Sequence, residues 1–404
     1  MKKPIYVVVI LLLIIVTACT ETGKIKPLNS PLIMNINPKN INNKAKLSSI
    51  FSGIKIITLK TDNKEGLVGK INKILQGNNG KCLIIGDGNS LKIFNSDGNF
   101  KFELENGEGP GKFNHIGAFT TGYNDTTFSF IDYYKQKLYV YSFNDKMLNS
   151  AYLKLNVENF SAINNNVYAL YSSGSGEKYK LNYFDLKTNK IVDRYFHFSK
   201  EYSRFLNIMA NNFFKWNDST YFINVPFDTV YFLNSNLSKP APAIVANFGK
   251  YEFKKKYYNI PFQNIMELIQ FTQKNNLAFD IDRFFPVENS LFFSYSYAGR
   301  FYPAVYNIRS KMVKNLFKFT DDVAVKGHTV KLFNYFYPIG NVMEGLVFAV
   351  DPLQLKEQVD SIVKPMDNKA LHKFKKDNMI LYNTYTKITP KTNTLLVIYE
   401  AKKK

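Results

Sequence analysis

The chain of 404 residues has little cysteine, with Cys19 near the N-terminus and Cys82 inside the apolar run at 81–85. If Cys19 is modified, one thiol remains, so we expect no intramolecular disulfide. Cysteine is among the most buried residue types, which predicts a strand-core position for Cys82. Histidine is also scarce: the four residues are His115, His197, His328 and His372. They show no HxH or HExxH spacing, so the sequence predicts no metal and no cofactor.

Arginine is rare, since it supplies five of the 53 basic residues that give the chain a formal net charge of +21. Nucleic-acid-binding proteins concentrate Lys and Arg on one face or stripe. Here the lysines are spread along the chain, at turns and at alternating strand positions. We therefore expect no nucleic-acid partner and favour a solvated surface. Attraction to anionic lipid or polysaccharide is the alternative interpretation of the charge.

Long apolar runs are absent except at the N-terminus, where Lys2 and Lys3 precede the uncharged run Ile5–Val16. A positive start, a short apolar stretch and a small-residue cleavage site are typical of a secretory signal. The run is shorter than the roughly 20 residues that span a bilayer. It ends at Val16-Thr17-Ala18-Cys19, which matches the lipobox of bacterial lipoproteins. We predict a signal peptide over 1–18, acylation of Cys19 and anchoring through its acyl chains, as in palmitate-bearing lipoproteins.

The next segment, 19–50, is polar, rich in Asn and Lys, and carries Pro27, Pro31 and Pro38. Its apolar content is too low to offset the entropy of ordering, which predicts a flexible tether. The remainder, 51–404, is long for one ordinary domain unless it is a repeat array or a propeller.

Short β-branched and aromatic runs separated by Asn, Asp, Gly and Ser dominate the chain from residue 54 onward. The stretch Ile71–Leu104 holds four such runs, and Ser96-Asp97-Gly98 is a hairpin signal between the last two. The same four-run pattern recurs over 119–153, 160–198, 213–248 and 284–319, and less regularly from Tyr335. Four-stranded repeats of this length predict an all-β fold, a six-bladed β-propeller of antiparallel blades, with seven blades as the alternative.

The ends of the chain supply two further strands, Ile54–Leu59 and Thr394–Tyr399. Open sheet edges invite aggregation, so we expect both strands to complete the last blade and close the ring. Two segments break the strand pattern, and their apolar spacing predicts short helical insertions within 250–279 and 351–378. We expect these helices to lie over a face of the propeller, where they cap the fold or line a ligand site.

The stretch Leu91–Phe100, followed by Gly107-Glu108-Gly109-Pro110-Gly111-Lys112-Phe113, resembles the six-bladed β-propeller lipoproteins of Bacteroidetes, which are related to NHL-repeat propellers. The resemblance covers most of 50–400 and implies a propeller in the cell envelope without an established activity. Lys112 stands where the family pattern has Glu, so a ligand or cation held by that Glu would be lost here.

The glycine-rich loop is the first candidate binding site, with Gly107, Gly109, Gly111, Lys112 and His115 as its members. Exposed glycine amides near a channel mouth can bind an anion or a sugar hydroxyl. The alternative is a tight turn between two blades, because glycine tolerates a positive φ and proline presets a turn. We favour the turn.

Asp87 and Asp132 are the second candidates, since each follows the second strand of a blade. Their carboxylates can accept backbone amides of the next turn, and we favour that structural role over ligand binding. No paired carboxylates in a recognisable context and no nucleophile elbow occur in the sequence, so we assign no catalytic residue.

The sequence therefore predicts a membrane-anchored propeller that binds a protein, peptide or glycan of the cell envelope without catalysis. The alternatives are a lyase or hydrolase acting on polysaccharide or peptide, and a structural role in an outer-membrane assembly. Glu21 is the only acid close to Cys19. Because surface export is associated with several acids there, we expect an outer-membrane lipoprotein facing the periplasm, with surface exposure as the alternative.

Overall fold

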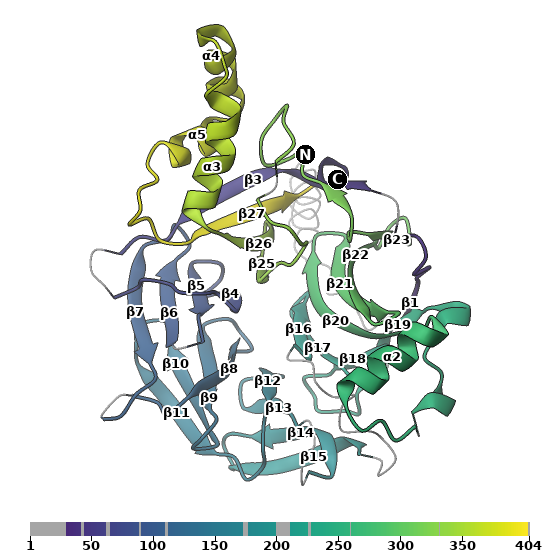
Figure 1. The fold of residues 1–404 in the computed structure, drawn as a ribbon. Coiled ribbons are helices and arrows are strands. Elements are labelled where there is room, and N and C mark those ends of the chain that lie inside the picture. The colour runs from purple at the N-terminus through teal and green to yellow at the C-terminus, as the bar shows by residue number, and fades with distance from the viewer. Residues whose placement is uncertain are drawn as a thin grey trace, which may run out of the picture.

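The computed structural model describes residues 30–41, 44–61, 65–88, 90–109, 112–172, 177–198, 211–224, 228–258, 260–330 and 332–402. The signal peptide and Cys19 lie outside these residues. Six sheets stand around a common axis, each with four antiparallel strands (Figure 1). The predicted six-bladed β-propeller is confirmed. No helix within the described ranges has both the length and the apolarity to cross a membrane.

The first five blades follow the chain, each running from an inner strand outward. Blade 1 consists of β4 (Lys73–Gly77), β5 (Cys82–Gly86), β6 (Ser90–Asn95) and β7 (Phe100–Glu105). Blade 2 consists of β8 (Ile116–Thr121), β9 (Thr127–Asp132), β10 (Lys137–Ser142) and β11 (Met147–Tyr152). Blade 3 consists of β12 (Asn159–Ala162), β13 (Val167–Tyr171), β14 (Tyr179–Asp185) and β15 (Lys190–His197). Blade 4 consists of β16 (Phe213–Trp216), β17 (Ser219–Ile223), β18 (Thr229–Leu233) and β19 (Ala241–Asn247). Blade 5 consists of β20 (Ala278–Val287), β21 (Ser290–Tyr297), β22 (Arg300–Asn307) and β23 (Met312–Asn315).

Burial explains why the middle strands read as continuous apolar runs. In β5 all five residues are buried, since one side packs toward blade 2 and the other toward blade 6. The outer strand β15 is mostly exposed and mixes polar with apolar residues. A strand covered on both faces loses the alternation that marks a strand with one wet face. The hairpin at Gly98 also fits this packing, because its φ is +90° and an added Cβ would lie 2.3 Å from the carbonyl oxygen of Thr58.

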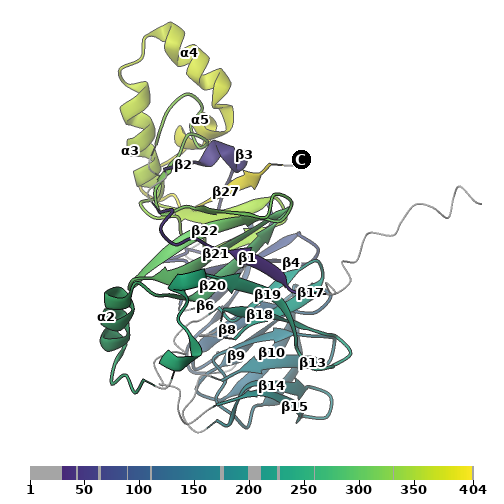
Figure 2. The same ribbon diagram turned by 90° about the vertical axis from the view of Figure 1, so that its right-hand side faces the viewer.

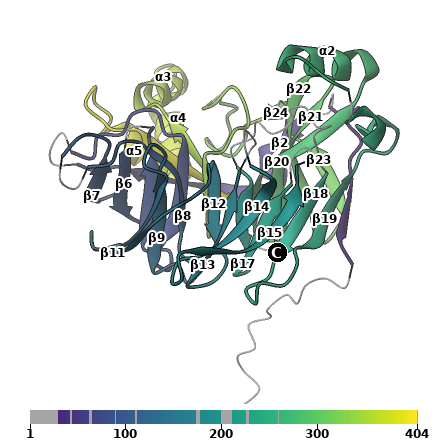
Figure 3. The same cartoon turned by 90° about the horizontal axis from the view of Figure 1, so that it is seen from below.

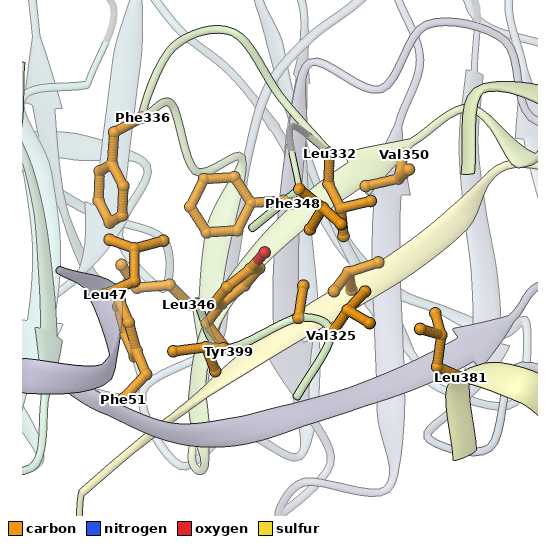
Figure 4. Packing of buried hydrophobic residues seen from close by; sticks show 14 of the residues in the cluster. Leu47, Phe51, Val325, Leu332, Phe336, Leu346, Phe348, Val350, Leu381 and Tyr399 are labelled. Carbon is orange, nitrogen blue, oxygen red and sulfur yellow. The ribbon is translucent and has the colours of Figure 1, made fainter. Parts of the chain in front are cut away.

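Blade 6 is built from both ends of the chain, as predicted. It contains β25 (Gly340–Val342), β26 (Gly345–Val350), β27 (Leu395–Ala401) and β3 (Phe51–Thr58), with β27 paired between β26 and β3. Figure 4 shows Phe51, Phe348 and Tyr399 side by side in the core of this blade. The inner strands then close the ring, because each contacts the inner strands of both neighbouring blades.

The tether prediction is wrong for residues 32–41 and 44–50. Strand β1 (Leu32–Asn35) pairs in parallel with the outer strand of blade 4, and Met34 and Ile36 are buried there. Beyond it, β2 (Ala45–Lys46) pairs with β24 (Phe319–Thr320), and the 3₁₀ turn η1 (Leu47–Ser49) buries Leu47. A few apolar side chains on an existing edge suffice to order this polar segment, and β1 covers an edge strand that would otherwise be open.

The insertion between blades 4 and 5 contains the 3₁₀ turns η3 (Gly249–Tyr251) and η4 (Lys255–Tyr257) and the helix α2 (Ile265–Asn275). The Asn264 side chain caps α2 by accepting from the backbone NH of Glu267. Figures 2 and 3 show α2 on one face of the propeller, so this helical prediction is confirmed.

The insertion in blade 6 forms α3 (Pro352–Val363), α4 (Asn368–Asp377) and α5 (Met379–Tyr385). Its helical content is confirmed, but the expected position over a face is wrong. The helices project from the outer rim next to β3 (Figure 1). Leu355, Phe374 and Leu381 join the blade 6 core. The apolar side of these helices therefore extends that core outward.

Candidate functional site: the central channel

The inner strands of all six blades surround a cavity of about 970 Å³ along the propeller axis. Because every blade repeats the same strand order, the inner strands run in one direction. Their first residues lie at one mouth of the channel, which we call the entry mouth, and their last residues at the other, the exit mouth. The volume falls at the upper end of the range typical of ligand pockets.

Amide, aromatic and charged side chains mix in the channel lining. The amides include Asn72, Gln76, Asn211, Asn217, Asn289 and Asn341. The aromatic residues include Phe119, Tyr133, Phe214, Trp216, Phe284 and Tyr337. The cations are Lys73, Lys215 and Arg283, and the acids are Asp125, Glu158, Asp218 and Glu288. Such a lining can hold a ligand that carries both apolar and hydrogen-bonding groups.

A lysine of blade 4 connects to blade 2 near the exit mouth. The Lys215 Nζ donates to Thr121 Oγ1 at 3.0 Å and lies 3.1 Å from Asp125 Oδ1, and it also donates to the carbonyl of Gly122. Burial lowers the pKa of Lys215, and the nearby Asp125 carboxylate opposes that shift. Blades 2 and 4 are not adjacent in the ring, so this side chain spans the exit end of the channel and narrows it.

Lys73 occupies the entry end of blade 1. Its Nζ donates to the carbonyl of Phe119 at 3.0 Å and lies 5.1 Å from the centroid of that ring. Burial lowers the pKa of Lys73 to about 8, because the charged form loses hydration. The ammonium is therefore the main ionic form at neutral pH but loses its proton more easily than an exposed lysine.

The inner strand of blade 5 carries acids that sequence reasoning missed. Burial raises the pKa of Asp280 to about 8 and that of Asp282 to about 6. The Arg283 guanidinium opposes both shifts, and its Nε donates to Asp282 Oδ2 at 3.0 Å. On the neighbouring blade, burial also raises the pKa of Asp228. The sequence feature that could have indicated these acids is Asp280-Ile281-Asp282-Arg283, which places three charged residues inside a strand that is otherwise apolar.

The glycine-rich loop lies outside the channel lining. Gly107 and Gly109 have φ of +154° and +108°, which fits the predicted turn, while Gly111 lies outside the described residues. Lys112 forms an ion pair with Glu105 of the same loop region. His115 lies against Tyr133, with ring centroids 5.7 Å apart, so one aromatic ring separates it from the cavity.

Asp87 and Asp132 also lie away from the lining, in the turn positions that the sequence favours. Asp132 accepts from the backbone NH groups of Asn114 at 2.9 Å and Lys135 at 3.2 Å. Asp87 accepts from the Ser90 backbone at 3.0 Å and forms a buried ion pair with Lys92 at 2.8 Å. The structure does not bring these residues together with His115 at one point. Within the described residues, no three His, Cys, Asp or Glu side chains form a group that could hold a metal ion.

The fold and its cavity define a closed six-bladed β-propeller with an axial channel. The chain belongs to the family described as Domain of unknown function (DUF4934), whose model matches residues 32–400. That match includes β1 and therefore agrees with a folded domain that starts before residue 51. A comparison with curated proteins finds no match.

Two solved structures from Bacteroides are similar to the chain. One, from Bacteroides fragilis, is described as a candidate exported protein, with 20% identity, a TM-score of 0.70, and coverage of 92% of this chain and all of that one. At this identity the likeness shows the shared fold. The other, a member of the DUF4221 family from Bacteroides vulgatus, has 10% identity and a TM-score of 0.49 over 88% of this chain and 98% of that one.

Proposed function

We propose that this propeller is a non-catalytic binding module of the cell envelope, which holds a protein, peptide or glycan ligand in its central channel. The observation that carries the proposal is the cavity of about 970 Å³ with amide, aromatic and charged groups from all six blades. The lyase or hydrolase alternative has less support. Burial raises the pKa of one lining acid, Glu158, but Asp280 and Asp282, whose pKa values burial raises to about 8 and about 6, are not among the described residues that line the cavity.

Blocking the entry mouth tests this proposal. Asn72 and Asn211 precede the inner strands of blades 1 and 4, which are opposite each other in the ring. In the double variant Asn72→Trp/Asn211→Trp, two indoles would obstruct the same mouth. A matched control, Asn149→Trp/Lys190→Trp, places indoles on the exposed outer strands β11 and β15.

The probes are a panel of tripeptides and a panel of oligosaccharides, tested by calorimetry. We expect the wild type and the control to bind at least one probe, and the blocked variant to lose that binding. Binding that survives the blocked mouth, or no binding to either panel, would contradict the proposal.

The anchoring part of the proposal concerns Cys19 and the lipid bilayer. We propose an outer-membrane lipoprotein that faces the periplasm, related to the NHL-like lipoprotein propellers. The exported relative from Bacteroides fragilis and the lipobox sequence support it. Cells that express the full chain and are fed an alkyne-tagged palmitate should label the wild type but not Cys19→Ala. Equal labelling of both would overturn this part.

A further inference from the structure

The inner strand of blade 5 is irregular where it meets the channel. Strand β20 shifts register twice against β21, between Phe279 and Asp282 and between Asp282 and Phe285. Asp280 and Arg283 have φ of +60° and +55°, in the left-handed region that non-glycine residues rarely adopt. Bulges of this kind redirect side chains and are common beside functional sites. Strained non-glycine residues are grounds for a functional hypothesis about this strand.

Arg283 is the charged side chain of the irregular strand that lines the channel. Its Nε donates a hydrogen bond to Asp282, and its guanidinium carbon lies 3.9 Å from the centroid of the Tyr337 ring. Its Nη1 is buried and has no hydrogen-bond partner in the structure. A buried cationic donor without a partner is costly. A carboxylate is its best-matched acceptor, because its two oxygens fit the planar guanidinium.

An apolar groove of about 280 Å³ lies next to Arg283, between blades 5 and 6. Its walls include Phe285, Phe293, Phe301, Phe317, Phe336 and Pro303. Phe301, Tyr335 and Tyr337 remain 56%, 74% and 55% exposed. Among the described lining residues, polar side chains are limited to Arg283, Ser294, Tyr335 and Tyr337. The groove is thus suited to one apolar side chain and poorly suited to a sugar, whose hydroxyls would find few partners.

The groove and the channel are neighbours that share part of their lining. Arg283, Phe285, Tyr337 and Pro338 line both cavities. Beyond this point the channel offers amide side chains, which can pair with the NH and C=O groups of a peptide backbone. An acid consisting of one apolar group would fill the groove and leave the channel empty.

We propose that this site binds the carboxyl terminus of a peptide or protein whose last residue is apolar. The terminal carboxylate pairs with Arg283, the last side chain occupies the groove, and the preceding residues extend into the channel. This inference rests on the proposed binding function and names its ligand class.

The test uses an N-acetylated tripeptide that ends in Phe, either with a free carboxylate or with a C-terminal amide, titrated into the purified full chain by calorimetry. We expect the acid to bind at least about tenfold more tightly than the amide, which lacks the charged pair. Arg283→Gln should weaken binding of the acid at least about tenfold and remove the preference over the amide. The control Arg300→Gln, at an exposed arginine on β22 of the same blade, should leave binding unchanged.

Arg283→Gln also removes the ion-pair partner of buried Asp282, so a second variant is needed. Phe301→Ala trims an exposed ring at the groove without altering the core, and it should weaken binding of the Phe-ending acid severalfold. A matching tripeptide that ends in Gly should bind weakly and show no response to Phe301→Ala.

Three results would overturn the inference. The acid and the amide could bind equally, Arg283→Gln and Phe301→Ala could leave binding intact, or 3-phenylpropionate could bind as tightly as the tripeptide, which would make a free acid the ligand. A fourth result separates the two proposals. If another probe binds and is lost on blocking the entry mouth while the Phe-ending acid fails to bind, this inference falls and the binding function stands.

Discussion

Blade 1 and the channel edge between blades 5 and 6 use charged residues in opposite ways. In the first region Lys92 Nζ lies 2.8 Å from Asp87 Oδ2 and 2.7 Å from Glu103 Oε1, so its charge is paired within the fold. In the second, Asp280 and Arg283 each keep a buried polar atom without a partner and adopt a strained backbone. The contrast teaches that charged residues near a conspicuous motif can be structural, while an unsatisfied donor that lines a cavity, as Arg283 does, is a candidate for ligand binding.

The largest expected effect is in the first region. Lys92 is 5% exposed, and Lys92→Met would leave Asp87 and Glu103 without their cation. Breaking a buried pair on one side costs about 3–5 kcal/mol of unfolding free energy, measured here by urea titration. The matched variant Lys112→Met removes a half-exposed pair with Glu105 and should cost less than about 1 kcal/mol. Similar losses in the two variants would remove the basis of the comparison.

Asp280→Asn should raise the unfolding free energy, where Lys92→Met lowers it. Burial raises the pKa of Asp280 to about 8, so between about pH 4 and pH 8 the folded state holds a proton that the unfolded state has released. Wild-type stability should therefore fall as the pH rises through this window. Asp280→Asn lacks that loss and should be more stable by about 1–3 kcal/mol above pH 8. Urea midpoints at about pH 5 and about pH 9 measure the stability of both proteins before and after this loss. A constant difference at both pH values would contradict the assignment.

A smaller loss is expected from Asp132→Ala, which removes the acceptor of two backbone NH groups in the blade 1–2 region. We expect about 1–2 kcal/mol less stability and unchanged binding of every channel ligand. Thermal unfolding and calorimetry check the two parts. Loss of binding without loss of stability would place the ligand-binding site in the blade 1–2 region.

The smallest effect concerns Lys73. Burial lowers its pKa to about 8, so between about pH 8 and pH 10.5 the unfolded state binds the proton that the folded state has lost. The unfolding free energy of the wild type should therefore rise by about 1 kcal/mol over this window, and that of Lys73→Met should not. Urea midpoints followed across the window measure the difference. Parallel curves for the two proteins would show that Lys73 is fully hydrated.

Much of the fold follows from the sequence because its signals are local. Turn residues such as Asp97-Gly98 separate the strands of every blade, and the unpaired strands at the two ends predict ring closure. The order of 32–41 and 44–50 is not predictable from composition because β1 pairs with an edge of blade 4 and β2 pairs with β24. For the same reason composition could not place α3–α5 at the rim, where the blade 6 core extends outward.

The candidate site is harder to predict, because the channel gathers one short segment from each blade. Lys73, Lys215 and Arg283 are far apart in sequence and meet only around the axis. The glycine-rich loop attracted attention through its motif, which the turn between two blades explains. The charged run at Asp280–Arg283 was the signal that could have indicated blade 5, since charge is unfavourable in a buried strand.

The most direct test of the account is hydrogen exchange of the backbone amides, measured with and without the Phe-ending tripeptide acid. The account predicts that the peptide slows exchange in β20 and over 335–343, and leaves the loop over 105–116 unchanged. Protection of the loop over 105–116 with no change in β20 would contradict it and place the ligand at the glycine-rich motif.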